Sequence, residues 1–432
     1  MPPETVPVLA TADVDPIAES NVVTAKRPGG VVRGGTIALA SRAIGLFASL
    51  ATGIITARAL GPTGKGTLAF LSSASALLIR AGSVGLDGSF THFYLTRRRP
   101  LADCIGAVVW IVIAVAGALV IAAEIALLLV PRLTAAAPLA LAAPFFAATP
   151  AYAVLFVSTF VFFALGRETF FGVFDVGYRA ALLLAFTVAL IVAGGGVATA
   201  VWVQITVSVA FATIAAVAIG RSAGWRFPLN RPLVREMLGY GSRYYAYGLL
   251  RYALCYEGIL IAGVVLNDRD TGLLSVGAML GEAIVLFAGS INLAFYPAVS
   301  TAADPRAYTA RTSWRIFLMS IAIGGALAIV AHPLIRLLYG PAFLPSVAAY
   351  LWMLPGFVLL SAEQVVSSYF ATRGMPQWII GVLLAGTVGG GALAVAMGSI
   401  YGVNGVAAAV GAAQVCASAV VLLRFARSRE EG

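Results

Sequence analysis

The sequence predicts an all-α, polytopic membrane protein with about 12 transmembrane helices in two pseudo-symmetric six-helix lobes around a central cavity. Three observations lead to this fold class: the composition, the placement of the basic residues and an internal repeat. Of the 432 residues, 60% are hydrophobic and 11% are charged, whereas soluble chains have ~45–50% and ~25%. An apolar excess of this size must face lipid, which excludes a soluble enzyme, a disordered scaffold and a disulfide-framed secreted domain.

Apolar runs long enough for a membrane crossing, which needs ~20 residues, follow one another along the chain. In order, they are Gly35–Ala57, Thr67–Phe90, Ala102–Val130, Leu139–Leu165, Phe170–Ala193, Val197–Gly220, Tyr244–Leu266, Gly272–Val299, Trp314–Ala331, Ser346–Ala371, Trp378–Gly398 and Val403–Leu423. We therefore expect twelve crossings, with both ends of the chain on the same side.

The basic residues support this count and give it an orientation. With both ends on one side, 19 of the 28 Lys and Arg residues fall on that side, 5 on the other and 4 within spans. Because Lys and Arg concentrate on the cytoplasmic side of a membrane, we expect cytoplasmic N- and C-termini. The net charge of +10 is then a topology signal. A nucleic-acid partner is not expected, since no folded polar domain carries clustered bases.

The chain also divides into similar halves. Leu60–Gly66 lies 206 residues before Leu266–Gly272, and other Gly and Ala positions recur at nearly the same offset. Six spans per half give both halves the same orientation, which makes the repeat a parallel one about an axis along the membrane normal. The expected domains are a disordered cytoplasmic tail (1–32), a six-helix lobe (33–220), a basic cytoplasmic linker (221–243), a second six-helix lobe (244–424) and a short cytoplasmic tail (425–432).

Several short motifs then carry a family resemblance. They are Ser41-Arg42-Ala43-Ile44-Gly45, Leu60-Gly61-Pro62, Gly85-Leu86-Asp87, Phe295-Tyr296-Pro297, Leu338-Tyr339-Gly340-Pro341 and Tyr401-Gly402-Val403-Asn404-Gly405. Together they resemble the polysaccharide exporter (O-antigen flippase) family, the oligosaccharide flippases of the multidrug/oligosaccharidyl-lipid/polysaccharide superfamily. The related lipid II flippases carry a second arginine where this chain has Ala48, and usually fourteen spans. The resemblance is therefore to the shorter O-antigen type.

The resemblance implies a function as well as a fold. A member would flip a polyprenyl-pyrophosphate oligosaccharide from the cytoplasmic to the outer leaflet of the bacterial inner (plasma) membrane by alternating access, for cell-surface polysaccharides such as lipopolysaccharide. Its partners would be the lipid-linked oligosaccharide, membrane lipids, and the polymerase or glycosyltransferases of the same pathway. It would be a transporter and not an enzyme.

Cations within spans are the first candidate site residues, because ionisable groups in a bilayer default to functional positions. Arg42, Arg80 and Arg251 are candidates for binding the pyrophosphate, which cannot leave water unpaired. Arg42 matches the Ser-Arg motif of the family, and its alternative role is snorkelling to the headgroups. The alternative for Arg80 is an ion pair within one lobe. Tyr252 and Tyr256, one helical turn apart, are candidates for contacting sugar, with plain packing as the alternative.

Carboxylates within spans are candidates for ion coupling. Glu257, Glu282 and Glu363 are expected in the second lobe, where desolvation disfavours the charged form and suits coupling to H⁺ or Na⁺. The alternative role of these three is hydrogen bonding within that lobe. Asp87, in the second span, is a further candidate for ion coupling, and its alternative role is helix capping. No other cofactor is expected, since three scattered cysteines and two histidines form no metal-ligand pattern.

Two other functions remain open. A cation-coupled drug antiporter of the same fold would favour carboxylates over cations, because its cargo is cationic. An integral-membrane polysaccharide ligase or polymerase would carry a large outer loop, whereas the expected outer loops are short.

Overall fold

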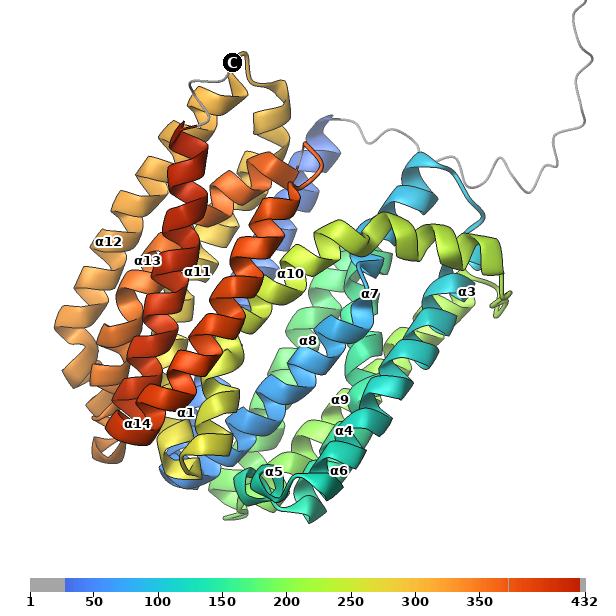
Figure 1. Cartoon of the computed structure of the whole chain (residues 1–432). Helices are drawn as coiled ribbons and strands as arrows, with labels where there is room; N and C mark the ends of the chain where they lie inside the picture. The colour runs from blue at the N-terminus through green and yellow to red at the C-terminus, as the bar shows by residue number, and fades with distance from the viewer. Residues whose placement is uncertain (1–27, 372, 428–432) are drawn as a thin grey trace, which may run out of the picture.

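A computed structural model describes residues 28–371 and 373–427. Within these ranges the chain forms helices joined by short connections, and the described residues contain no strand. Figure 1 shows the helices as a bundle whose two halves approach each other at one end and diverge toward the other. The predicted all-α class is confirmed.

The first half contains most of the short helices. In order, its elements are α1 (Pro28–Ser83), α2 (Leu86–Thr91), η2 (His92–Thr96), α3 (Leu101–Ile111), η3 (Val112–Ala116), α4 (Gly117–Leu129), α5 (Pro131–Ala136), α6 (Leu139–Ala147), α7 (Thr149–Ala164), α8 (Glu168–Phe186), η4 (Thr187–Val192) and α9 (Val197–Ser222). Three of these, η2, η3 and η4, are π-helical turns that continue or extend neighbouring α-helices.

The second half contains longer, less interrupted helices. Its elements are α10 (Arg231–Val265), α11 (Asp268–Thr301), α12 (Pro305–Leu338), the 3₁₀ turn η5 (Pro341–Phe343), α13 (Ser346–Ala371) and α14 (Gln377–Arg427). Side chains at the helix starts fix where they begin. Asn230 accepts a hydrogen bond from the Leu233 amide, and Asp304 accepts from the amides of Arg306 and Ala307, as N-cap residues do.

Ten segments of the described chain are long and apolar enough to cross a membrane. Two of them, Phe47–Thr96 and Gln377–Arg427, have 50 and 51 residues, more than twice what one crossing needs. Each is a hairpin (Figure 1), broken at Gly61 (φ 65°) and Gly402 (φ 60°), where only glycine adopts positive φ without strain. With the first arm of α1 counted from Pro28, the two hairpins and the eight other segments make twelve crossing-length arms, in agreement with the sequence.

The described ends of the chain, residues 28 and 427, lie at one end of the bundle, which we call the terminal end. The hairpin turns of α1 and α14 lie at the opposite end, which we call the tip end (Figure 1). Basic residues gather at the terminal end, where Arg424 lies over the Trp378 ring at 4.8 Å and Arg306 donates to the Phe425 carbonyl at 2.7 Å. An even number of crossings predicts that the two ends of the chain, and the basic residues that flank them, lie on the same side of the membrane.

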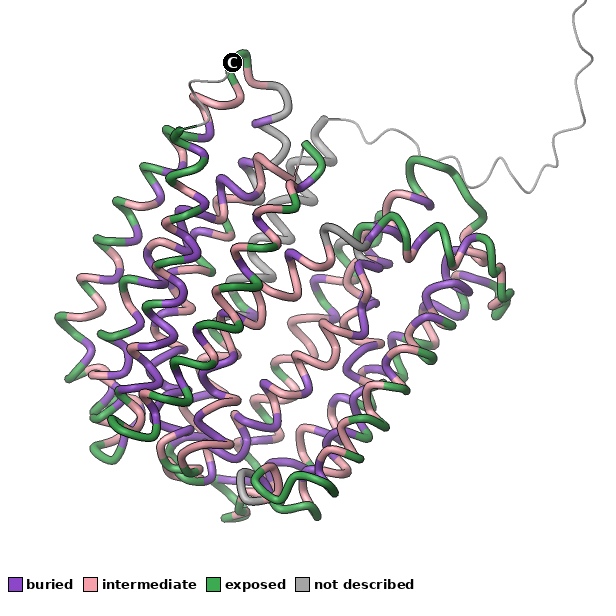
Figure 2. The backbone as a smooth tube through the Cα atoms, viewed as in Figure 1, coloured by how far each residue is buried: buried purple, intermediate pink, exposed green. Residues whose placement is uncertain are grey.

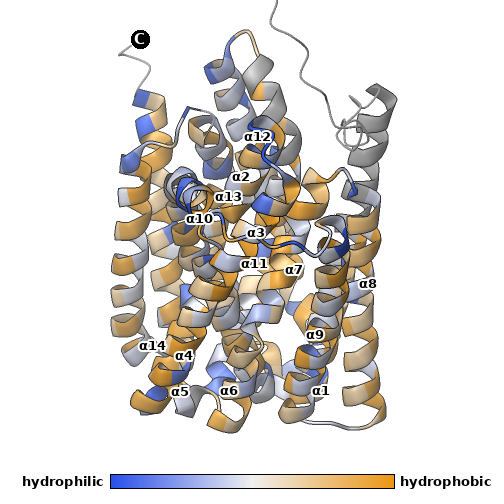
Figure 3. Cartoon of the chain, turned by 90° about the vertical axis from the view of Figure 1, so that its right-hand side faces the viewer, coloured by the Kyte–Doolittle hydropathy of each residue, from blue (hydrophilic) through white to orange (hydrophobic). Residues whose placement is uncertain are grey.

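Apolar side chains both fill the core and cover the outside. Figure 2 shows buried positions where helices face one another and exposed positions on their outer faces. Figure 3 shows that these outer faces, as on α8, α9 and α14, are largely hydrophobic. Large exposed side chains such as Trp202 (52%) and Ile329 (83%) are what a bilayer-facing surface requires. The chain is a multi-pass membrane protein.

The stretch predicted as a linker, 221–243, is largely helical. It comprises the end of α9, a loop and the first turns of α10. These turns lie across α2: Ser89 Oγ donates to the Met237 carbonyl at 2.8 Å, and Gly85 packs against Gly241. The remainder of α10 then crosses into the second half (Figure 1). The domain boundaries proposed from the sequence stay predictions.

At the tip end, the two halves meet through glycine backbones. A β-carbon on Gly66 would overlap the Asp268 carbonyl oxygen, and one on Gly272 would overlap the Pro62 carbonyl oxygen. The same β-carbons would lie 2.9 Å and 3.0 Å from the amide nitrogens of Gly272 and Gly66, respectively. Gly66 and Gly272 are 206 residues apart, and so are Pro62 and Asp268, so each residue of one half meets the copy of its neighbour in the other half. Reciprocal contacts of this kind are the mark of a two-fold axis, so the repeat's pseudo-axis passes between Gly66 and Gly272.

Enlarging Gly66 is expected to weaken the contact between the halves. Gly66→Ala places a methyl group against backbone atoms that cannot rotate away, so we expect a loss of about 1–3 kcal/mol of stability and a lower melting temperature in detergent. The matched control is Gly325→Ala on α12, where a β-carbon meets nothing within 4 Å. Equal melting temperatures for the two variants would contradict the close approach.

Candidate functional site

Arg80, on the second arm of α1, begins a line of polar side chains between the two halves. It lies roughly 28 Å along the arm from Gly61 at 1.5 Å per residue, in the half of the bundle nearer the terminal end. Its guanidinium carbon is 4.8 Å from the Phe156 ring centre and 5.7 Å from the Tyr252 ring centre. Phe156 belongs to α7 and Tyr252 to α10, so this cation bridges the halves through aromatic faces.

No ion pair of Arg80 is seen among the described side chains, which do not include Asp87. The alternative that the sequence offered, an ion pair within one lobe, therefore finds no partner in this part of the chain. The Arg80 side chain is half-buried. A guanidinium held by aromatic faces keeps its five donors free for an anion.

The line continues along α10 into α11. The Tyr252 and Tyr256 rings stack with centroids 4.3 Å apart, and the Tyr256 side chain hydrogen-bonds Glu282. The structure thus brings together four predicted residues, Arg80, Tyr252, Tyr256 and Glu282, from three helices. Stacking between the tyrosines leaves only their outer faces for another ring.

Lys65 is a residue that the sequence analysis missed. Its stretch was assigned to a loop, but Lys65 lies on the second arm of α1, four residues past the break, and is half-buried. Its ammonium donates to Thr56 Oγ1 at 3.2 Å and lies within electrostatic range of Glu282. Proline is common in the first turn of a helix. Pro62, followed by helix-compatible residues, is therefore the sequence signal that could have placed Lys65 on a helix.

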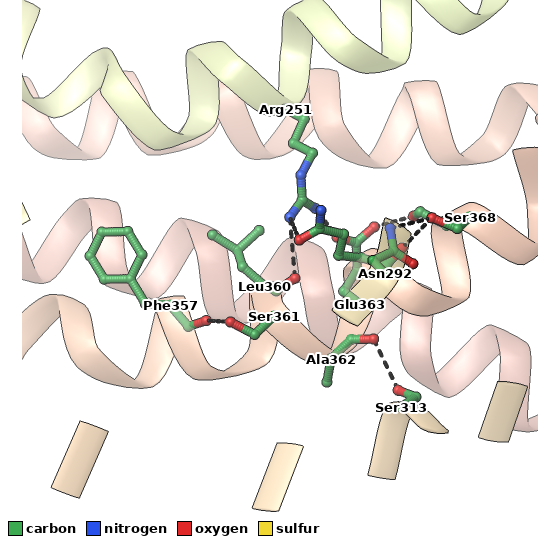
Figure 4. A network of polar contacts seen from close by, with 11 residues as sticks. Arg251, Asn292, Ser313, Phe357, Leu360, Ser361, Ala362, Glu363 and Ser368 are labelled. Carbon is green, nitrogen blue, oxygen red and sulfur yellow. Dashed lines mark hydrogen bonds and ion pairs between the residues drawn. The ribbon is translucent and has the colours of Figure 1, made fainter. Parts of the chain in front are cut away.

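Arg251 and Glu363, predicted for separate roles, contact each other. Figure 4 shows Arg251 reaching from α10 to α13, where it forms an ion pair with Glu363 and donates to the Leu360 carbonyl at 3.3 Å and Gln364 Oε1 at 3.4 Å. Ser367 Oγ donates to the other Glu363 oxygen. Glu363 is 1% exposed, so this charge pair lies inside the second half.

Glu257 faces the glycine-rich first arm of α14. A β-carbon on Gly390 would lie 2.9 Å from Glu257 Oε1. This oxygen is buried and has no hydrogen-bond partner among the described residues, and the nearby Gln414 Oε1 is in the same condition. A buried carboxylate oxygen without a partner is costly, and in this Glu257 differs from Glu363, whose two oxygens are both paired.

Two predicted residues are placed only by their backbone. Arg42 lies on the first arm of α1, and Asp87 lies on α2. Their side chains lie outside the described part of the structure. Arg179, a further arginine within a span, pairs with Asp175 one helical turn away, with 3.0 Å between Arg179 Nε and Asp175 Oδ2.

Side chains tie the halves together at the tip end. Arg58 donates from Nε to the Leu338 carbonyl at 2.7 Å and from its terminal nitrogen to the Leu337 carbonyl, at the C-terminus of α12, where a cation is favoured. Thr67 Oγ1 donates to Asp268 Oδ2 at 2.9 Å. With the Gly66–Gly272 contact, these bonds hold the tip end together, while the halves diverge toward the terminal end (Figure 1).

Comparison with known proteins supports the fold and the broad family. A sequence model of a family described as "Polysaccharide biosynthesis protein" matches residues 171–348. No curated protein sequence matches the chain. Over these residues the family model supports the predicted resemblance to polysaccharide exporters, and the structural matches support the predicted fold.

Solved transporters share the fold at low sequence identity. The chain is similar to an inward-facing multidrug resistance MATE family transporter of the MOP superfamily (TM-score 0.71, 13% identity, 92% of this chain and 99% of that one). It is also similar to the lipid II flippase MurJ in an inward closed conformation (TM-score 0.72, 13% identity, 91% and 87%). An outward-facing MATE structure gives a TM-score of 0.60 (13% identity, 93% and 97%). The protein has the fold of these transporters.

We expect Arg251 and Glu363 to behave as one unit in stability measurements. Removing either partner leaves the other charge buried and unpaired, so Arg251→Met or Glu363→Met alone should cost about 3–5 kcal/mol. The double variant should cost clearly less than the sum of the two. The measurement is a double-variant cycle of thermal or denaturant unfolding in detergent, and additive losses would show that the pair is not coupled.

Proposed function

We propose that the protein is a flippase that moves a polyprenyl-pyrophosphate oligosaccharide from the cytoplasmic to the outer leaflet of the bacterial inner membrane. The observation that carries this proposal is Arg80, a cation without a described carboxylate partner, held between aromatic faces of both halves. An ionisable group at such a position is expensive in a membrane. An anionic headgroup is the cargo that would offset this cost.

The chemistry of such a cargo accounts for the neighbours of Arg80. A pyrophosphate must exchange water for cations and hydrogen-bond donors as it crosses, and Arg80 and Lys65 are cations on the same arm of α1. The tyrosines of α10 add aromatic surface for sugar. Because both halves contribute to this line, relative motion of the halves would change its access from one side to the other.

The direction of transport follows from the proposed orientation. With cytoplasmic termini, the terminal end faces the cytoplasm, so Arg80 lies in the half of the bundle that receives cargo. The tied tip end would then be the closed outer gate. Alternating access requires Arg58 and Thr67 to release Leu338 and Asp268 as the outer side opens. Enzymes that build or polymerise the oligosaccharide would act before and after this step.

We further propose that Glu282 and Glu257 couple transport to H⁺ or Na⁺. Glu282 lies between Tyr256 and Lys65 at the contact of the halves, so a change in its charge alters the interactions between them. Glu257 offers an oxygen without a described partner inside the second half. Arg251 and Glu363 neutralise each other, and we assign them to stability and not to cargo binding.

Loss of the Arg80 charge should impair transport. Hydrogen bonds to charged groups contribute about 1.5–3 kcal/mol, so Arg80→Gln is expected to slow translocation about 10- to 100-fold. The measurement follows a lipid-linked oligosaccharide across proteoliposome membranes. The matched control is Arg336→Gln, at an exposed position at the tip end of α12, which should keep the wild-type rate. Wild-type protein without translocation activity would overturn the proposed function.

The same preparation tests the drug-antiporter alternative, which the likeness to a MATE transporter supports in fold. An antiporter would raise resistance to cationic drugs in cells, and Arg80→Gln would preserve or increase that resistance by removing a repulsive charge. Under the flippase proposal, resistance is the same with and without the protein.

Coupling at Glu282 predicts a different defect from that of Arg80→Gln. Glu282→Gln should abolish the stimulation of translocation by an imposed pH or sodium gradient, while leaving exchange without a gradient close to wild type. The experiment compares rates with and without each gradient. Equal stimulation of the variant and the wild type would remove Glu282 from the coupling step.

A further inference from the structure

A pocket of about 910 Å³ opens at the tip end, away from the line of residues around Arg80. Both halves contribute to its walls. Thr63 and Arg132 come from the first half, while the end of α10, the start of α11 and Val395 to Ser399 of α14 come from the second. Its position at the junction of the halves, at the level of the interhelical turns, is that of a membrane headgroup region.

Two guanidinium groups give the pocket a positive polar end. Arg132, on α5, and Arg269, on α11, both line it. Both side chains are exposed, and no ion pair or hydrogen bond of either is seen among the described residues. The carboxylate that also lines the pocket, Asp268, accepts a hydrogen bond from Thr67. The pocket is therefore lined by two guanidinium groups without a described partner and by one carboxylate that is already hydrogen-bonded.

Aliphatic side chains form another part of the lining, beside the polar residues Thr63, Asn267 and Ser399. Val264, Val265 and Leu266 at the end of α10 line the pocket together with Val395 and Ala396 of α14, and Val265 and Leu266 lie beside α14, near Gly398. Val264 and Val265 end one candidate span, Val395 and Ala396 lie within another, and Arg269 lies in the first turn of the span that follows α10. The pocket is thus amphipathic, because two guanidinium groups and the aliphatic ends of α10 and α14 line the same space. A soluble anion would use only half of this surface.

We propose that this pocket binds the phosphate-bearing headgroup of an anionic lipid, with Arg132 and Arg269 contacting the phosphate and the α10–α14 wall contacting the first part of the chain. Paired arginines match the geometry of phosphate oxygens. Two molecules could supply this phosphate: a resident phospholipid of the membrane, or the lipid carrier of cargo that is leaving the transporter. Only the second source rests on the proposed function.

Lipid retention tests the headgroup site. The full-length protein is purified in detergent, mixed with phosphatidylglycerol or phosphatidylcholine, and examined by native mass spectrometry. Wild type should retain phosphatidylglycerol over phosphatidylcholine. Arg132→Gln and Arg269→Gln should each lower the retained phosphatidylglycerol several-fold, and Arg269→Lys should restore part of it. Arg336→Gln removes the same charge at the same end outside the pocket and should match the wild type.

Retention by both pocket variants equal to that of Arg336→Gln, or equal retention of the two phospholipids by the wild type, would overturn the proposal. A variant that does not give a monodisperse peak is replaced by its lysine counterpart, which keeps the charge and should bind. That counterpart should retain less phosphatidylglycerol than the wild type, because an ammonium cannot form the bidentate contact of a guanidinium, and retention equal to that of the wild type would overturn the proposed arginine–phosphate contact.

Competition separates the two sources. Undecaprenyl phosphate that displaces phosphatidylglycerol at lower concentration identifies the carrier as the ligand, and the same variants should then slow translocation. Weaker competition identifies a resident phospholipid, and the headgroup site stands with that ligand. Absence of translocation by wild-type protein would overturn the flippase proposal without changing the binding result, so the two failures are distinguishable.

Discussion

The backbone contact of Gly66 with Gly272 is the constraint on which the arrangement of the halves depends. Because neither residue has a side chain, two helix starts approach until peptide groups touch, closer than helices with larger residues can pack. This contact fixes the tip end as the point of convergence. The side chains that must meet across the halves, including Arg80 and Tyr252, are positioned by how the helices diverge from there.

Charged residues within the spans are of two kinds, those that are paired with another charge of the protein and those that are not. Arg251 and Glu363 satisfy each other inside the second half, together with carbonyl and hydroxyl groups, as buried charges generally must. Arg80 is instead held by aromatic faces. One buried carboxylate oxygen of Glu257 has no hydrogen-bond partner among the described residues. A charge that the protein does not itself neutralise is the one available to a ligand, a proton or an ion.

Much of the fold could be predicted from the sequence, because apolar runs and basic residues encode crossings and sides. The line of residues between the halves could be predicted only in part. Arg80, Tyr252 and Glu282 are recognisable as polar groups within apolar runs, whereas Lys65 follows a Gly-Pro pair that reads as a loop. The Arg251–Glu363 pair joins positions 112 residues apart, and only helix packing determines which distant spans become neighbours.

The glycine contact also links the histories of the two halves. After an internal duplication, the copies of most positions can change separately, because each copy has its own surroundings. Gly66 and Gly272 are copies that form each other's surroundings, so a larger residue at either one displaces the backbone of the other. The two positions are therefore constrained together. We expect homologues to keep a small residue at both, even where the rest of the repeat is no longer recognisable in the sequence.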